Sequence, residues 1–199
     1  KKVIDSGFKP DLILAIGGGT VIDYAKSANC LSKNILPEQI ISGKISYKKK
    51  TKLCAIPTTA GSGAEVTENA VLYLKEIKYS VEDKLIKPDF FFLIPELIVN
   101  SGFQLKASSG FDAIAQGVES ILSIKSNEQS LKYSEKSLTF SFKNYENYLK
   151  KPNIENTNGM CMAANLSGKA ISIARTTAPH AISYPFTSIF NVSHGHAVS

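Results

Sequence analysis

The feature that most constrains the fold is a short apolar run that ends in three glycines. Residues 11–16 read Asp-Leu-Ile-Leu-Ala-Ile, and residues 17–20 read Gly-Gly-Gly-Thr. A nearly continuous apolar run of this length predicts a strand buried in a parallel sheet. Residues 21–31 follow with the apolar spacing of a helix. This order of strand, turn and helix indicates an α/β fold with a crossover connection between parallel strands.

The rest of the chain divides into two parts of similar size. Further strands are predicted at residues 52–56, 71–74 and 90–94, and a loop at residues 34–50. From residue 106 onward there is little strand pattern, and helices are predicted at 111–123, 126–149, 159–174 and 179–184, with a connector at 152–158. We therefore expect an incomplete Rossmann-like parallel-sheet domain (1–100) followed by an incomplete, all-α helical domain (101–199).

Composition excludes several other classes of protein. Apolar residues make up 43% and charged residues 20% of the 199 residues, the balance of a globular protein. A membrane-spanning helix needs about 20 consecutive apolar residues, and no apolar run in the sequence approaches that length. We therefore expect no membrane partner. Although the formal net charge is +6, only Arg175 can supply a guanidinium fork, so Lys48–Lys50 and Lys52 are interpreted as a solvated loop rather than a nucleic-acid site. Three widely spaced cysteines predict free thiols and a cytoplasmic location: Cys30, Cys54 and Cys161.

Two loops follow predicted strands and offer groups that bind phosphate. In residues 17–20, amides free of Cβ obstruction open a helix whose N-terminus carries partial positive charge. The segment matches neither the GxGxxG nor the Walker pattern, so a tight structural turn is an equal alternative. Residues 57–63 read Pro-Thr-Thr-Ala-Gly-Ser-Gly after the next strand. Because ligands bind at the carboxyl ends of strands in open α/β sheets, the pair of loops favours a nucleotide site over two polar turns.

Polar side chains in the helical part could meet at a cation. Asp112 and Gln116 are four residues apart and share one face of a helix. Together with His180 and His194 they offer a carboxylate, an amide oxygen and two imidazoles, which can surround a divalent transition metal. An isolated helical histidine is more often a surface or core residue, so spacing alone leaves both possibilities open. Glu119 is either an acceptor behind these ligands or a solvated side chain.

Taken in order, these segments resemble the iron-containing (group III) alcohol dehydrogenase family. The matching motifs are Gly-Gly-Gly-Thr-x-x-Asp-x-x-Lys at 17–26, Pro-Thr-Thr-Ala-Gly-Ser-Gly-x-Glu-Val-Thr at 57–67, Gly-Phe-Asp-Ala at 110–113, Pro-His-Ala at 179–181 and His-Gly-His-Ala at 194–197. Order and spacing agree over almost the whole chain, so the combination is far more specific than any single motif.

The resemblance implies a two-domain enzyme with its substrate between a NAD(P)-binding domain and a helical domain that holds iron or zinc. It implies cofactor contacts from Gly18, Gly19, Thr20, Asp23, Thr58, Thr59, Ser62 and Lys78. It implies metal ligation by Asp112, Gln116, His180 and His194. Family members run to nearly twice this length. We therefore expect a fragment with both ends missing, and a homodimer for the full-length protein.

Two departures from the family pattern point to a subgroup. The usual ligand at the Gln116 position is histidine, and a proton-relaying histidine often stands where this chain has Tyr184, our candidate catalytic residue. Residues 112–120, 168–171 and 176–185 look like phosphonoacetaldehyde reductases, which form 2-hydroxyethylphosphonate. Lys169 or Arg175 could then face the phosphonate, with an ordinary surface role for both as the alternative.

The function expected from the resemblance is NAD(P)-linked, metal-dependent interconversion of an aldehyde and a primary alcohol. The substrate is a small molecule, with phosphonoacetaldehyde as the specific candidate. Two alternatives stay open: a general short-chain alcohol dehydrogenase of the same family, and a nucleotide-binding remnant without catalysis.

Overall fold

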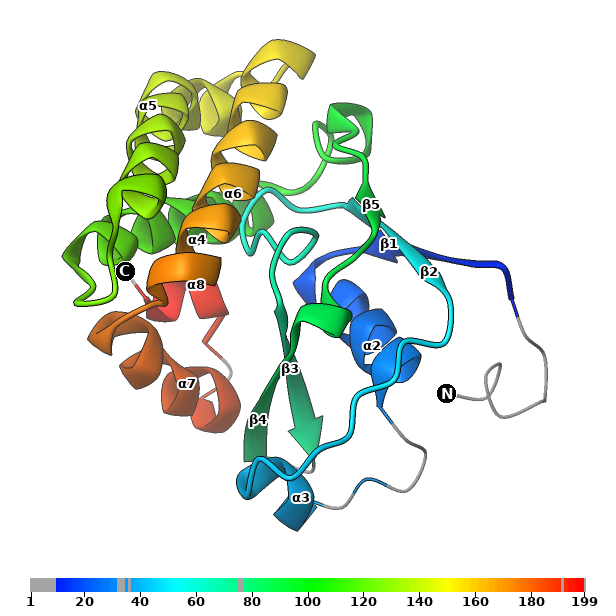
Figure 1. Cartoon of the computed structure of the whole chain (residues 1–199). Coiled ribbons are helices and arrows are strands. Elements are labelled where there is room, and N and C mark those ends of the chain that lie inside the picture. Colours follow the sequence, from blue (N-terminus) through cyan, green and yellow to red (C-terminus); the bar gives the residue numbers. More distant parts are fainter. Residues whose placement is uncertain (1–9, 32–34, 36, 75–76, 191, 199) are drawn as a thin grey trace.

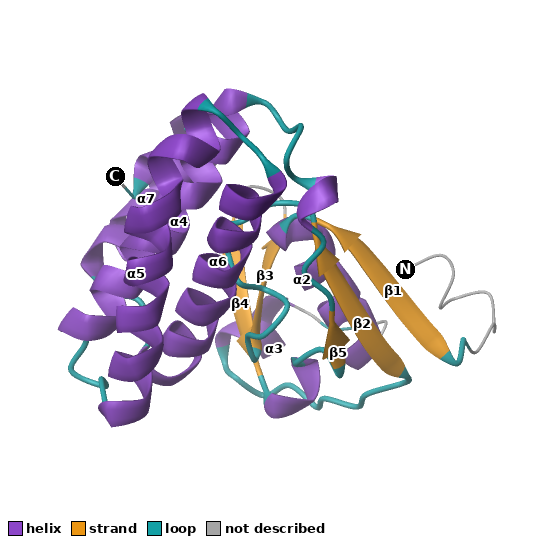
Figure 2. Ribbon diagram, turned by 90° about the horizontal axis from the view of Figure 1, so that it is seen from above, coloured by secondary structure: helices purple, strands orange, loops and turns teal. Residues whose placement is uncertain are grey.

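A computed structural model gives the fold of residues 10–31, 35, 37–74, 77–190 and 192–198. Figures 1 and 2 show two halves side by side, one built from strands around a helix and the other from helices alone. This arrangement confirms the expected fold class, an α/β part followed by a helical part.

The α/β half contains the predicted parallel sheet. Its strands are β1 (Leu12–Gly17), β2 (Lys52–Pro57) and β5 (Phe90–Phe91), in the order β1-β2-β5. Helix α2 (Gly19–Cys30) makes the connection after β1, and its Ile22 is buried with Leu53 and Ala55 of β2. These apolar contacts fix α2 to one face of the sheet.

The opposite face of β1 corrects the expectation of a strand buried on both sides. Leu12, Leu14 and Ile16 are about half exposed there, whereas Ala15 points to α2 and is buried. The alternation follows from the two-residue period of a strand, with no described element covering the second face. The last predicted strand, 90–94, is also shorter than expected, because the 3-10 helix η2 (Pro95–Leu97) follows it closely.

A separate antiparallel hairpin stands beside the sheet. The predicted strand at 71–74 is part of β3 (Asn69–Leu74), which pairs with β4 (Ile77–Glu82) and not with the parallel sheet. The sequence analysis missed β4, in which apolar residues alternate with Lys, Ser and Glu. It also missed the short helices α3 (Pro37–Ile41) in the predicted loop and η1 (Lys84–Ile86).

The helical half contains α4 (Phe103–Leu122), α5 (Glu128–Lys150), α6 (Ile154–Ala174), α7 (Ala178–Phe190) and α8 (His194–Ala197). Three predicted boundaries are wrong. Helix α4 begins eight residues before residue 111. The predicted connector at 152–158 is mostly the first turn of α6, because Asn153 caps that helix through the Asn156 amide. Helix α7 continues beyond Pro185, where the sequence predicted its end.

A close approach of two backbones joins the halves. Gly63, in the loop after β2, lies against Gly168 of α6, where a Cβ atom on Gly63 would be 2.5 Å from the Gly168 Cα. Beside it, Asn165 of α6 donates a hydrogen bond to the buried carboxylate of Glu65 at 3.0 Å. The loop after β2 is therefore held between the sheet and the helices.

The lysine-rich segment is largely exposed, in line with the expected solvated loop, and two of its lysines bind neighbouring elements. Lys49 pairs with Asp89 at 2.8 Å, and Lys50 donates to the carbonyls of Ala28 and Leu31 at the end of α2. The three cysteines are free, as expected, and all three are buried. None of the helices in the described ranges has the length and apolar character needed to cross a membrane.

Candidate functional site

The two predicted phosphate-binding loops meet at one end of the sheet. Because β1 and β2 are parallel, with Gly17 opposite Pro57, the residues that follow them emerge together. They form one wall of a cleft of about 480 Å³ whose other wall is helical. Predicted site residues that line this cleft are Gly18, Gly19, Thr20, Asp23, Thr59, Ser62, Asp112, Gln116, His180, Tyr184 and His194.

The glycine turn has the form of a cradle for an anion. Gly18 precedes α2 without a side-chain cap, no acidic residue stands in the first helical turn, and Gly18, Gly19 and Thr20 line the cleft. A Cβ atom on Gly19 would lie 2.7 Å from the Ser62 hydroxyl. The two loops therefore pack closely at Gly19, whereas a Cβ atom on Gly18 would be in ordinary contact with Thr59 at 3.5 Å.

Asp23 lines the cleft and also binds other residues, whereas Thr58 does not line it and the side chain of Lys78 is not described. One carboxylate oxygen of Asp23 accepts the Val71 amide at 3.0 Å and the other lies 3.4 Å from the Lys26 ammonium, so Asp23 also fastens α2 to β3. Thr58 donates its amide to the Gly17 carbonyl and is not among the residues that line the cleft. Lys78 lies in β4 opposite Tyr73, and its side chain is outside the described part of the structure.

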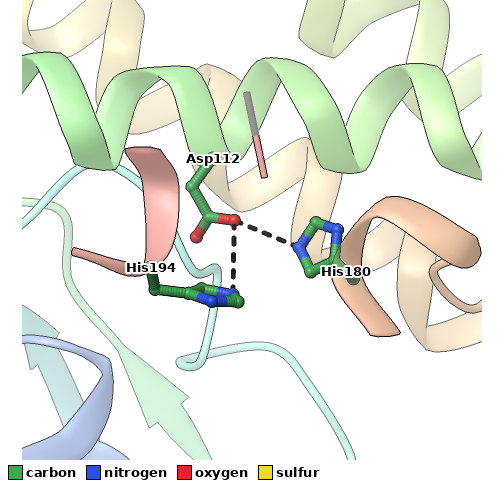
Figure 3. Close-up of side chains that lie close together, drawn as sticks. All are labelled: Asp112, His180 and His194. Atoms are coloured by element: carbon green, nitrogen blue, oxygen red, sulfur yellow. Dashed lines mark hydrogen bonds and ion pairs between the residues drawn. The ribbon is translucent and has the colours of Figure 1, made fainter. Parts of the chain in front are cut away.

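Three predicted metal ligands converge across the cleft. The Asp112 carboxylate points from α4 toward the imidazoles of His180 on α7 and His194 at the start of α8 (Figure 3). Oδ1 of Asp112 lies 3.2 Å from His180 Nε2 and 3.9 Å from His194 Nε2. One ligand atom from each residue falls within 4.8 Å of the others. A carboxylate oxygen with two imidazole nitrogens is a donor set that suits zinc or iron, so these residues fit the expected cation.

A second layer of hydrogen bonds stands behind the histidines. Glu119 lies about two turns after Asp112 in α4. Its carboxylate lies 2.5 Å from His180 Nδ1 and accepts hydrogen bonds from both the amide and the hydroxyl of Thr177. Ser183 lies 3.3 Å from His194 Nδ1 and donates to the His180 carbonyl at 2.7 Å. Sequence analysis singled out Glu119 but not Thr177 or Ser183. Threonine and serine are common in the helical half of the chain, and the Glu119 that Thr177 binds is far from it in the sequence.

The electrostatics of His180 follow from these neighbours. Burial by itself lowers the pKa of His180, but its hydrogen bonds to Asp112 and Glu119 and the charges of both carboxylates outweigh burial. The pKa of His180 is therefore raised above the ordinary value. Protons and a metal ion compete for its Nε2, which makes metal binding weaker in acid.

Gln116 reaches the same cleft with its amide already engaged at both ends. Its Oε1 accepts a hydrogen bond from Ser167 of α6 at 2.9 Å, and its Nε2 lies 3.5 Å from the Ser62 carbonyl. The carbonyl oxygen has a second lone pair, so metal ligation by Gln116 remains a prediction.

Tyr184 stands at the edge of the metal cluster. Its ring stacks on His194 with a centroid separation of 6.0 Å and an interplanar angle of 21°. This half-buried position on the cleft wall keeps it a candidate for proton transfer. His196 is exposed and lines a neighbouring hollow with Phe103 and Tyr145 instead.

Each half of the chain matches the model of a known protein family. Residues 4–95 match the family model "Iron-containing alcohol dehydrogenase", and residues 106–199 match "Fe-containing alcohol dehydrogenase family, C-terminal". The chain is 34% identical to phosphonoacetaldehyde reductase of Streptomyces viridochromogenes, covering 95% of this chain and 51% of that protein. It is 30% identical to 4-hydroxybutyrate dehydrogenase of Clostridium kluyveri, covering 93% of this chain and 51% of the relative.

Among solved structures, sulfoacetaldehyde reductase from Bifidobacterium kashiwanohense, in complex with NAD+, superposes with a TM-score of 0.91 at 28% identity. The match covers 98% of this chain and 53% of that one. The chain thus spans about half the length of the relatives that it matches. With both family models matched in sequence order, the chain belongs to the iron-containing alcohol dehydrogenase family.

Proposed function

We propose that the protein to which this chain belongs interconverts an aldehyde and a primary alcohol, using NAD or NADP and a divalent iron or zinc ion. The observation that carries the proposal is the convergence of Asp112, His180 and His194 in the cleft that the glycine turn also lines. A bound cation supplies Lewis-acid polarisation of a carbonyl oxygen, and a bound nicotinamide supplies the hydride.

The residues of the chain have separate tasks in this proposal. The α2 N-terminus at Gly18 and Gly19 binds the pyrophosphate, and the hydroxyls of Thr59 and Ser62 orient the dinucleotide from the second loop. Asp112, His180 and His194 hold the cation. Tyr184, stacked on His194, moves a proton through its phenolic oxygen.

The specific substrate candidate is phosphonoacetaldehyde. Its support is the similarity to phosphonoacetaldehyde reductase, together with the likeness to a sulfoacetaldehyde reductase. Both of those names describe two-carbon aldehydes that carry a tetrahedral anion. In this chain the cleft presents several hydroxyls to such a group, including Ser108, Ser109 and Thr176.

One observation favours the second candidate, a general aldehyde or alcohol substrate. None of the described residues that line the cleft is a lysine or an arginine. Arg175 forms an ion pair with Glu82 of β4, and the Lys169 ammonium lies over the rings of Phe91 and Tyr133. Neither cation is therefore placed for the phosphonate contact that the sequence suggested.

The test is a substrate panel with the full-length protein. NADH and NADPH oxidation is followed with phosphonoacetaldehyde, sulfoacetaldehyde, acetaldehyde and propanal, before and after chelation and metal replacement. Activity lost on chelation and restored by metal supports the proposal, and preference among the aldehydes decides the substrate. A protein that binds the dinucleotide but neither metal nor aldehyde would be the remnant without catalysis. Sedimentation of the same preparation tests the expected homodimer.

A further inference from the structure

We propose that Glu119 and Ser183 are positioning residues that keep the hydrogen of both cluster imidazoles on Nδ1, so that each Nε2 faces Asp112. The inference deepens the proposed function and rests on it, because it concerns the same metal site. Neither residue is a ligand in that proposal. Both touch the histidines from behind, on the side away from Asp112.

The Glu119 contacts fix the tautomer of His180. Glu119 is 3% exposed, and its two oxygens face the His180 ring nitrogen Nδ1 and the amide and hydroxyl of Thr177. An ionised carboxylate only accepts hydrogen bonds, so Nδ1 of His180 must be the donor. In the neutral ring the lone pair is then on Nε2, which lies 3.2 Å from the Asp112 oxygen.

Counting hydrogens at Ser183 gives the same result for His194. The Ser183 hydroxyl is fully buried and has one hydrogen, which it donates to the His180 carbonyl at 2.7 Å. Toward His194 Nδ1, at 3.3 Å, the hydroxyl can therefore only accept, and that nitrogen must carry the hydrogen. The lone pair of His194 is again on Nε2, which lies 3.9 Å from the same oxygen of Asp112.

The two assignments together explain why a cation fits between these side chains. With both rings neutral, two nitrogen lone pairs and a carboxylate oxygen face one another, and these three acceptors repel unless a proton or a metal ion lies among them. Outer partners of metal-binding histidines set ring orientation and basicity, and their loss typically lowers metal affinity about 10–100-fold. The Thr177 contacts also tie the start of α7 to α4 through the same carboxylate.

The experiment measures tautomers and metal affinity in the 199-residue chain, which contains three histidines. Long-range ¹H–¹⁵N spectra of the chain labelled at histidine and loaded with Zn²⁺ report which nitrogen carries the hydrogen. Competition with a chelator gives the Zn²⁺ dissociation constant. The variants are Ser183→Ala and Glu119→Gln. The matched control is Ser137→Ala, which removes an equally buried hydroxyl that donates to the Ala163 carbonyl at 2.8 Å, away from the cluster.

We expect Nδ1–H patterns for His180 and His194 in the zinc-loaded chain. Ser183→Ala should weaken Zn²⁺ binding about tenfold and change the tautomer populations of His194, whereas Ser137→Ala changes neither. Glu119→Gln should weaken Zn²⁺ binding by about 10–100-fold and change the tautomer populations of His180. If Glu119→Gln does not fold, Ser183→Ala decides the question alone, with Ser137→Ala as the reference for losing one buried hydroxyl.

Three outcomes would overturn the inference. Zinc bound through Nδ1 of either histidine contradicts it, as do wild-type affinity and tautomers in both variants, and in these cases the proposed metal site survives. A chain that folds but binds no Zn²⁺ also overturns the inference, and the chelation step of the substrate panel with the full-length protein then decides the proposed function separately.

Discussion

A single oxygen atom organises the candidate metal site. Oδ1 of Asp112 is the point that both Nε2 atoms approach, and Asp112 is 5% exposed, so its charge faces the imidazoles rather than bulk water. Gln116, one turn further along α4, contributes an amide that already accepts from Ser167. An amide oxygen is a weaker partner for zinc or iron than an imidazole nitrogen.

We predict that Gln116→His tightens Zn²⁺ binding by the chain on the order of tenfold, the equivalent of one added favourable contact. The Ser167 hydroxyl keeps its bond to the Ala164 carbonyl at 3.0 Å, so no buried hydroxyl is left without an acceptor. Chelator competition with wild type, Gln116→His and Gln116→Ala measures the effect. Unchanged or weaker binding in the histidine variant would show that position 116 does not reach the metal.

The residues that sequence could predict are those with a pattern of their own. Gly18 and Gly19 stand between a strand and a helix, and Asp112 and Gln116 share one helical face. By contrast, joining His180 and His194 to Asp112 needed the family resemblance, because nothing in their spacing brings them together. Ser183 could not have been found at all, since buried serines are frequent in these helices.

At the scale of elements, one carboxylate fastens the lysine-rich segment to the sheet. Asp89 accepts the Leu53 amide of β2 at 2.9 Å and pairs with Lys49 and Lys52. Burial alone would raise the pKa of Asp89. The hydrogen bonds from Lys49, the Leu53 amide and Lys52, with the charge of Lys49, instead lower it to about 2.

This lowered pKa predicts a specific acid sensitivity. Because the folded-state pKa lies below the ordinary value of 3.8, the stabilisation by Asp89 is fully present above about pH 4 and is lost as pH falls toward 2. We expect Asp89→Asn to be less stable than wild type at pH 7 and to lose less stability between pH 5 and 2.5. Urea unfolding at a series of pH values tests this. Parallel pH profiles for the two proteins would refute the assignment.

The junction between the loop after β2 and α6 allows a matched glycine comparison. Gly63 has φ +60° and its Cβ position is 2.5 Å from the Gly168 Cα, whereas Gly43 has φ +67° with nothing within 4 Å. We predict that Gly43→Ala costs about 1–2 kcal/mol, for the backbone conformation alone. Gly63→Ala adds a collision to the same penalty and should cost about 2–5 kcal/mol in total.

Denaturant unfolding of both glycine variants measures the difference, and dinucleotide affinity of Gly63→Ala reports whether the loop has moved. Equal losses of stability would mean that the approach of Gly63 to α6 can relax without cost, and the loop would not be the rigid joint described here.

Elements whose pattern is strong were predictable, and the failures have local causes. The β1–turn–α2 unit follows its sequence pattern closely. Strand β4 was missed because polar residues occupy every second position of a short segment, and two of them, Ser80 and Glu82, are exposed. The start of α6 was missed because Asn-rich sequence is typical of loops, although asparagine is also a preferred helix cap, as at Asn153.

At the scale of the whole molecule, the functional cleft lies where two unlike halves meet. The sheet supplies the glycine turn and the helices supply Asp112, His180 and His194, so neither half holds the full set of predicted site residues. A boundary near residue 100 between an α/β domain and a helical domain remains a prediction. Because both halves line this one cleft, the loop after β2 packs against α6 and α4, where Gly61 approaches Ser109 of α4.

The sheet also carries an apolar face with consequences for the chain in solution. Leu12, Leu14 and Ile16 of β1 are exposed by 49%, 53% and 50%, and Phe90 and Phe92 are exposed at the other edge. Exposed apolar side chains at every second position of a strand at the edge of a sheet promote association. We therefore predict that the isolated 199-residue chain self-associates at high concentration and that Leu14→Lys suppresses this.

The control is Leu85→Lys, at a leucine of η1 exposed by 43% and remote from β1 along the chain. Sedimentation velocity across a concentration series distinguishes the two variants. If both lysines reduce association equally, added charge rather than the β1 face controls it, because the two substitutions change the net charge by the same amount.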